Sequence, residues 1–151
     1  MGAISSGGGI DAFRESMTAA SSLSVDPMSI ILSINRNAAA HAAILASRKL
    51  CPNMLAPEQD DLAMRFAGTL GYRGEGRFDA DDWLCESGRP PMLRDAAAAL
   101  QCELVEAHTF GTHSVLLCVV NRVHLGASPT ALVYANRQCG TVRHAAAGTE
   151  I

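Results

Sequence analysis

The 151-residue sequence lacks the features that mark several classes of protein. Lysine and arginine form no long run, and the formal charge of −3 argues against a nucleic-acid surface, where clustered basic residues neutralise phosphates. No stretch reaches the roughly 20 apolar residues that span a bilayer, and the first residues lack the basic-then-apolar pattern of a signal peptide. We therefore expect a cytoplasmic protein with no nucleic-acid or membrane partner.

Cysteine and histidine are present, but not in the spacings of a metal site. The five cysteines are an odd number at wide separations, without a Cys-x-x-Cys pair. No two histidines have the His-x-x-x-His spacing typical of a zinc-binding helix. We expect reduced thiols, in the core or on the surface, and no bound metal.

The sequence does contain enough apolar material for one core, with 48% hydrophobic and 18% charged residues. Its predicted strands are mostly joined by hairpins, with two or three helices inserted, rather than alternating with helices as in a doubly wound sheet. This order predicts a mainly β fold with helical insertions, arranged as a small barrel. We expect one domain over residues 11–143, a flexible N-terminus over 1–10 and a flexible tail over 144–151.

Local patterns predict the individual elements. Pro52 lacks a backbone donor, so it confines its strand to a sheet edge or a bulge. Glycine, proline and acidic residues fill 71–94 and predict a long excursion, in which Phe78 and Trp83 either close over a flat ligand or anchor the loop on the body. The predicted helices cover 11–17, 38–47 and 57–66, and the predicted strands cover 29–34, 50–55, 100–106, 115–123 and 131–134.

Residues 16–37 place polar groups at both ends of an apolar strand. A hydroxyl-rich loop over 16–27 precedes the strand, and Asn35-Arg36-Asn37 follows it, beside the start of the predicted helix. Helix amide donors together with the planar guanidinium of Arg36 suit a phosphate. His41, in the first turn of that helix, is either a neutral donor to a ligand oxygen or a plain surface histidine. The alternative for the whole stretch is a capped turn before a core strand.

Several segments resemble motifs of one protein family, and they follow one another in the same order as in that family. The Thr-Ala-Ser-rich segment 18–27, the strand ending in Asn35-Arg36, the Leu-Cys-Pro-Asn-Met-Leu segment 50–55, the Gly-Thr-His turn 111–113 and the Leu-Val-Tyr strand 132–134 all contribute. Over roughly residues 11–140 the chain resembles the flavin reductase family with the FMN-binding split β-barrel. Members of that family are the small reductase components of two-component flavin monooxygenases.

The resemblance implies a homodimer that uses NADH or NADPH to reduce free FMN or FAD and supplies the reduced flavin to a separate flavin-dependent oxygenase component. Hydride transfer between two cofactors needs no protein nucleophile, so the protein supplies stacking, orientation and hydrogen-bond donors. The alternative is a non-catalytic flavin-binding protein or an inactive truncated homologue.

The resemblance also implies roles for particular residues. Residues 18–22 would contact the isoalloxazine ring and ribityl chain, and residues 35–37 with His41 would hold the phosphate. His113 would orient the nicotinamide side with Arg137, and Phe78 would be a loop contact. The full set is Thr18, Ala19, Ala20, Ser21, Ser22, Asn35, Arg36, Asn37, His41, Phe78, His113 and Arg137.

One departure from the family pattern concerns the N-terminal part. Family members place a β-hairpin of about 20 residues between a first helix and the Thr-Ala-Ser loop, whereas here residues 13–17 run directly into Thr18. The chain is therefore expected to lack that hairpin. A barrel without it has an open edge, unless a partner subunit or the Gly-rich N-terminus covers the exposed backbone.

Overall fold

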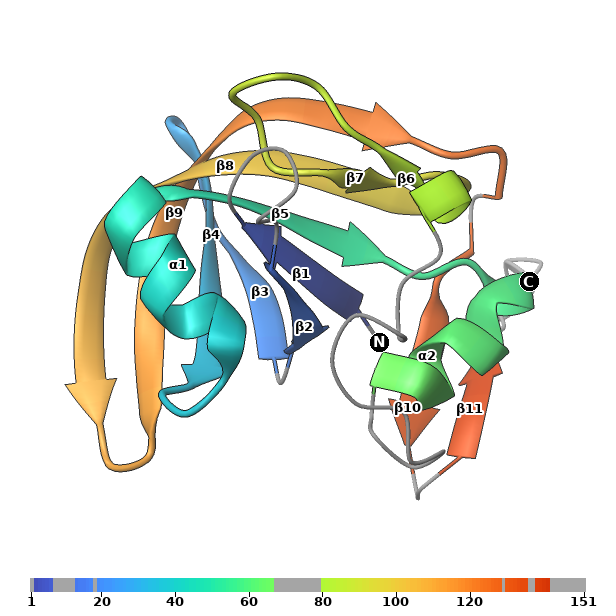
Figure 1. The fold of residues 1–151 in the computed structure, drawn as a ribbon, viewed down its shortest axis with the longest axis horizontal. Coiled ribbons are helices and arrows are strands. Elements are labelled where there is room, and N and C mark those ends of the chain that lie inside the picture. Colours follow the sequence, from blue (N-terminus) through green and yellow to red (C-terminus); the bar gives the residue numbers. More distant parts are fainter. Residues whose placement is uncertain are drawn as a thin grey trace, which may run out of the picture.

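The computed structural model describes residues 2–6, 13–17, 19–66, 80–128, 130–135 and 138–141. Its main element is a seven-stranded antiparallel sheet with strand order β2-β1-β5-β8-β9-β4-β3 (Figure 1). The strands of this sheet are β1 (Gly2–Ser6), β2 (Phe13–Met17), β3 (Ala19–Val25), β4 (Met28–Asn35), β5 (Lys49–Met54), β8 (Ala98–Phe110) and β9 (His113–Leu125).

Two small ribbons and short helices complete the described part of the chain. The ribbons are β6 (Trp83–Leu84) with β7 (Met92–Leu93), and β10 (Leu132–Ala135) with β11 (Gln138–Thr141). The helices are α1 (Ala39–Ser47), α2 (Asp60–Phe66) and the single turns η2 (Pro57–Gln59) and η4 (Ala80–Asp82). The prediction of a mainly β fold with helical insertions is confirmed.

The sheet curls round until its two outer strands approach each other at one end. β2 and β3 are the outer strands of the sheet, on opposite edges, yet only residue 18 separates Met17 from Ala19. Because one residue spans only about 3.3–3.6 Å, the two edges must meet at this corner. The sheet is thus a barrel that remains open along the rest of the seam, as the split-barrel prediction requires.

The N-terminal strands correct two expectations. β1 and β2 form an antiparallel hairpin, and β1 also pairs with β5 from Gly2 opposite Met54 to Ser6 opposite Leu50. The expected helix over 11–17 is therefore wrong for Phe13–Met17, and so is the expected absence of a hairpin before β3. Phe13 and Met17 are four residues apart, a spacing that puts them on one face of a strand as well as of a helix. β1 thus covers the edge of β5.

The hydroxyl-rich segment, expected to be a loop, is the strand β3. It pairs with β4 from Ala19 opposite Ser33 to Val25 opposite Met28, and the turn at Asp26-Pro27 joins the two strands. Nearly all side chains of β3 are exposed. An edge strand with this exposure needs no apolar alternation, so its serines give no strand signal.

The main core lies between α1 and the sheet. The predicted strand over 29–34 and helix over 38–47 are confirmed, and they bury Leu32 and Ile44 against β5, β8 and β9. Each fully buried aliphatic side chain contributes about 1.5–3 kcal/mol to folding. The cluster is Ile30, Leu32, Ile34, Ala40, Ile44, Leu50, Cys102, Leu104, Leu116 and Cys118.

A second cluster lies at the other end of the molecule, beneath α2 and β10 (Figure 1). Trp83 is 4% exposed and packs there with Leu93 and Leu132. Of the two alternatives for this tryptophan, anchoring of the loop is therefore confirmed, whereas Phe78 lies outside the described residues. The strand over 131–134 is confirmed as β10, but its partner β11 has no counterpart among the predicted strands. Neither α1 nor α2 is long and apolar enough to cross a membrane.

Arg48 joins the end of α1 to an irregularity in β8. The β8–β9 register shifts between Leu104 and Glu106, as at a β-bulge, which leaves carbonyl groups without their regular ladder partners. The Nη2 atom of Arg48 donates to the carbonyl oxygens of Leu104 and Val105 at 2.6 and 2.8 Å. Because β8 and β9 form one long hairpin, this contact ties the hairpin to α1.

β5 corrects the prediction made for Pro52. The strand lies between β1 and β8 and is therefore not an edge. Its pairing with β8 runs through Lys49, Leu50, Asn53 and Met54 and passes over Cys51 and Pro52. The missing donor of proline is accommodated by this interruption in the ladder, inside the sheet.

Asn53 is a fully buried amide that holds β5 to β7. Its Nδ2 donates to the Cys51 carbonyl at 2.8 Å, and its Oδ1 accepts from the Leu93 amide at 2.8 Å. We expect Asn53→Ala to lower the free energy of unfolding by about 2 kcal/mol, because it leaves two buried backbone groups unsatisfied. Urea unfolding measures the loss of stability. Asn121→Ala, at an exposed position of β9, is the matched control. Equal stability of the two variants would contradict the bridging role.

Candidate functional site

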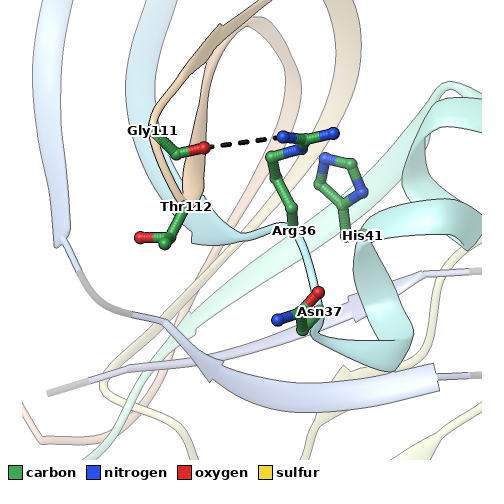
Figure 2. Close-up of a pocket in the computed structure, with 5 residues that line it drawn as sticks. All are labelled: Arg36, Asn37, His41, Gly111 and Thr112. Carbon is green, nitrogen blue, oxygen red and sulfur yellow. Dashed lines mark hydrogen bonds between the residues drawn. The ribbon is translucent and has the colours of Figure 1, made fainter.

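The candidate site is a hollow at the end of the sheet where β4, α1 and the β8–β9 turn meet. It has a volume of about 400 Å³ and is lined by Arg36, Asn37, His41, Gly111 and Thr112. Figure 2 shows the guanidinium of Arg36 extending between the Gly111 carbonyl and the His41 ring. The two sides of the hollow come from segments about 75 residues apart, joined by the pairing of β4 with β9.

Backbone hydrogen bonds explain why the chain turns here. The Arg36 amide donates to the Thr112 carbonyl at 2.9 Å, one residue beyond the end of β4. Asn35 then forms the turn into α1, since its Oδ1 accepts from the Asn37 amide at 2.9 Å and its carbonyl accepts from the Ala38 amide at 3.1 Å. Asn35 therefore stabilises the turn that carries Arg36 and Asn37, and it is not among the residues that line the hollow.

The hollow carries positive charge and free donor capacity. The Nη1 atom of Arg36 lies 3.5 Å from the Gly111 carbonyl oxygen, a weak contact, and within the described part of the chain no carboxylate forms an ion pair with Arg36. No side chain caps the N-terminus of α1, whose residue before the first turn is Ala38. A guanidinium beside an uncapped helix N-terminus is suited to bind an anion such as phosphate.

The β8–β9 turn brings backbone close to this charge. Gly111 has a φ of 57°, a conformation that non-glycine residues rarely adopt, and nothing lies within 4 Å of the position where a Cβ would be. The glycine is therefore required by the turn and not by crowding. It places the Thr112 hydroxyl at the rim, where Oγ1 lies 2.9 Å from Nδ1 of His113.

His41 is half-buried on the first turn of α1 and contacts the sheet. Its Nε2 lies 2.9 Å from Oγ of Ser114 on β9. The ring lines the hollow and has a partner on the sheet, and its role as a donor to a ligand oxygen stays a prediction. The contact of Ser114 with His41 could not be predicted from the sequence, because a single serine in an apolar strand does not indicate a partner.

The strand register places the remaining described candidates on the faces of the sheet. Ala19 lies opposite Ser33, Ser21 lies opposite Ile31, and Asn35 lies opposite His113. Residues opposite each other, and residues two apart, share a face. Ala19, Ser21 and His113 are thus on one face of the sheet, whereas Ala20 and Ser22 are on the other face, together with Ser114, the partner of His41.

The structure therefore brings together some of the predicted site residues and separates others. Arg36, Asn37 and His41 share one hollow, and Ala19, Ser21 and His113 share one face of the sheet. The lining role of Gly111 and Thr112 was not predicted, although the pair was recognised as part of a turn. Thr18, Phe78 and Arg137 lie outside the described residues.

The buried thiols are not nucleophiles. None of the five cysteines forms a disulfide, and burial raises the pKa of Cys51 and of Cys118 to about 12. Desolvation, with the neighbouring Cys118 and Cys51 thiols, also raises the pKa of Cys102. These groups stay protonated at neutral pH and lie in the core, away from the hollow. Among the described residues, no group of three histidine, cysteine or acidic side chains is placed to hold a metal.

Comparison with known proteins gives consistent matches along the chain. Residues 5–143 match the family model described as the flavin reductase like domain. FMN reductase (NADH) RutF of Agrobacterium fabrum (strain C58 / ATCC 33970) is 37% identical over 122 residues, which cover 80% of this chain and 68% of that protein. The 4-hydroxyphenylacetate 3-monooxygenase reductase component of Salmonella typhimurium (strain LT2) is 34% identical over 126 residues, covering 83% and 74%.

Solved structures share the fold. A crystal structure named as a flavin reductase, from Haemophilus somnus 129pt, superposes with a TM-score of 0.84 at 30% identity, covering 93% of this chain and 89% of that one. BorF, the flavin reductase component of a bacterial two-component tryptophan halogenase, superposes with a TM-score of 0.81 at 25% identity, covering 95% and 90%.

Proposed function

The chain belongs to the flavin reductase family, and from this premise we propose that it uses NADH to reduce free FMN and supplies the reduced flavin to a separate oxygenase. The reductase class follows from the family. FMN and NADH are named for the relative from Agrobacterium fabrum. The oxygenase partner is proposed because the Salmonella typhimurium relative is the reductase component of a monooxygenase.

The observation that carries the choice of a phosphorylated flavin is the hollow around Arg36. It offers a guanidinium whose described contact is one long hydrogen bond, an uncapped helix N-terminus and the rim hydroxyl of Thr112. These groups fit a phosphate in charge and in donor number. Asn37 and His41 supply further polar groups to the same hollow. We assign the FMN phosphate to this position.

We assign the flat part of the flavin to the sheet face that carries Ala19, Ser21 and His113. Ala19 and Ser21 of β3 present small, exposed side chains on this face, and His113 of β9 stands on the same face near the hollow. Small side chains allow a ring to approach the backbone closely. We propose that His113 orients the nicotinamide, and that Thr18, Phe78 and Arg137, predicted from the resemblance, complete the contacts.

The bound flavin supplies the hydride-accepting ring, so the protein needs no covalent chemistry of its own. Arg36 and α1 hold the phosphate end of the ligand. His113, whose Nδ1 is fixed by the Thr112 hydroxyl at 2.9 Å, contributes orientation. The buried thiols take no part, because they remain protonated.

We also propose that two copies of the chain associate and that they work in the cytoplasm. The β3–β4 hairpin exposes Leu23, Val25 and Met28, at 49%, 87% and 51% of their surface, which a second copy would cover. None of the five cysteines forms a disulfide, which agrees with a reducing compartment. Sedimentation velocity would measure the mass of the assembly.

The direct test is the oxidation of NADH by the purified chain with added FMN. We expect a rate well above that of free flavin alone, because bound FMN and NADH are held in one orientation. The reaction is followed at the absorbance of NADH, with FAD and NADPH in parallel reactions to rank the cofactors. FMN binding without NADH oxidation would identify a non-catalytic flavin-binding protein, and no binding of FMN or FAD would identify an inactive homologue.

A further inference from the structure

Phe110 is the last residue of β8, at the tip of the long β8–β9 hairpin, and 85% of its surface is exposed. The turn that follows it lies at the opposite end of the molecule from α2 and β10 (Figure 1). Single exposed hydrophobic residues are common, and Leu125, at the other end of the same hairpin, is 73% exposed. Exposure alone therefore does not distinguish Phe110, whereas its position does.

The strand register puts Phe110 on the face to which the flavin ring is assigned. Phe110 lies opposite His113, and His113 lies opposite Asn35. Ser33, two residues before Asn35, lies opposite Ala19. Opposite residues and residues two apart share a face, so Phe110 is on the face that carries His113 and Ala19.

The strand order also sets how far Phe110 is from the proposed flavin position. β8 is three strands from β3 in the sheet, which is roughly 14 Å along the sheet at about 4.7–4.9 Å per strand. A ligand whose first ring lies over β3 must therefore extend well beyond that ring to reach Phe110.

Gly111 connects Phe110 to the hollow. It follows Phe110 in the chain, it lines the hollow, and Figure 2 shows its carbonyl oxygen facing the guanidinium of Arg36. Apart from the residues that adjoin it in the chain, no atom of the described residues lies within 4 Å of the position where a Gly111 Cβ would be. The turn therefore leaves space for a ligand that continues from the hollow past Gly111.

Two dinucleotides have a group that extends this far. FAD continues from the flavin phosphate, which is assigned to the hollow, through a second phosphate to an adenosine. NADH continues from the nicotinamide, which is assigned to His113, through two phosphates to the same adenosine. FMN ends at its phosphate and has no group that reaches Phe110. The base that both dinucleotides bring to the hairpin tip is adenine.

We propose that Phe110 is a specificity residue that stacks on the adenine of a dinucleotide, FAD or NADH. Every nucleobase has a flat π-face, and its stacking on an aromatic side chain changes affinity by roughly fivefold or more. The choice of these dinucleotides rests on the proposed function. ADP carries the adenosine and two phosphates without flavin or nicotinamide, so it tests the phenyl ring separately.

The ring is tested by NMR titration of the native chain and its variants with ADP. Phe110→Ala and Phe110→Leu should both weaken ADP binding about 5- to 10-fold, because leucine keeps an apolar contact with His113 but offers no flat face. Phe110→Trp should bind ADP at least as tightly as the native chain. Leu125→Ala, at the other end of the hairpin, is the matched control and should change nothing. Equal ADP affinity of the native chain and Phe110→Ala, or no binding of ADP by the native chain, would overturn the inference.

The source of the adenine is tested with FAD, FMN and NADH. If the adenine belongs to FAD, Phe110→Ala should weaken FAD binding about 5- to 10-fold and FMN binding less than about twofold, as measured by flavin fluorescence. If it belongs to NADH, the same variant should raise the KM for NADH about 5- to 10-fold at unchanged kcat, with FMN as the acceptor. Equal weakening of FAD and FMN with an unchanged KM for NADH would show that Phe110 supports the hairpin through its pairing with His113, and would overturn the inference.

These outcomes separate the inference from the proposed function. A chain that binds ADP through Phe110 but does not reduce flavin would keep the adenine site and lose the assignment as a reductase. A chain that reduces FMN, and in which Phe110→Ala changes neither ADP binding nor the affinity for either dinucleotide, would keep that assignment and lose the adenine site.

Discussion

Arg36→Ala should weaken FMN binding about 10- to 100-fold while changing riboflavin binding by less than about twofold. The guanidinium is the strongest donor that lines the hollow, and a hydrogen bond to a charged partner contributes about 1.5–3 kcal/mol. Riboflavin has no phosphate and would lose nothing at this position. Quenching of flavin fluorescence measures both affinities on the same protein preparation.

Two further variants sharpen this experiment. Arg89→Ala removes an exposed arginine that pairs with Glu86, away from the hollow, and should leave both affinities unchanged. Arg36→Lys keeps the charge but loses the planar fork, so it should recover only part of the FMN affinity. If Arg36→Ala weakened FMN and riboflavin equally, the arginine would support the ring or the fold and not the phosphate.

Gly126→Ala should lower the free energy of unfolding by about 3 kcal/mol, and the melting temperature by roughly 10 °C. Gly126 follows β9, and its amide donates to the Ala97 carbonyl at 3.0 Å. A Cβ added there would collide with the backbone carbonyl oxygen of Ala96. Because this obstacle is backbone and not a flexible side chain, the chain must shift at the start of β8. Thermal unfolding followed by circular dichroism measures the loss.

The matched control is Gly140→Ala in β11. Nothing lies within 4 Å of the added Cβ at this position, so stability should change by less than about 0.5 kcal/mol. A melting temperature for Gly126→Ala as high as that of Gly140→Ala would mean that the close approach of Gly126 to Ala96 is not maintained in solution.

Patterns that depend on neighbouring residues predicted their elements well. The alanine-rich run over 38–47 has high helix propensity and forms α1, and the uncharged run over 29–34 forms the buried strand β4. The turn at 111–112 was recognised from its glycine. These elements carry Arg36, Asn37 and His41, so three of the five residues that line the hollow could be named from the sequence.

Elements that depend on distant partners were predicted poorly. β3 has almost no buried side chain, and β1 is held by pairing with β5 about 45 residues later, so neither has a local signal. Pro52 is tolerated inside the sheet because the β5–β8 ladder passes over it, which depends on the register of another strand. Ser114 acquires its partner only when α1 folds over β9. All four features, β3, β1, the position of Pro52 and the contact of Ser114, depend on segments that are far apart in the sequence.

The hydrogen bond from the Arg36 amide to the Thr112 carbonyl has a thermodynamic consequence. It continues the β4–β9 pairing into the hollow, so unfolding of the long hairpin would dismantle the proposed anion site at the same time. A ligand that binds the folded chain alone stabilises it by RT ln(1 + [L]/Kd), about 2.7 kcal/mol at a hundred times the dissociation constant. A phosphorylated flavin bound at the proposed site would then add to the thermal stability of the whole barrel, by an amount that grows with its concentration.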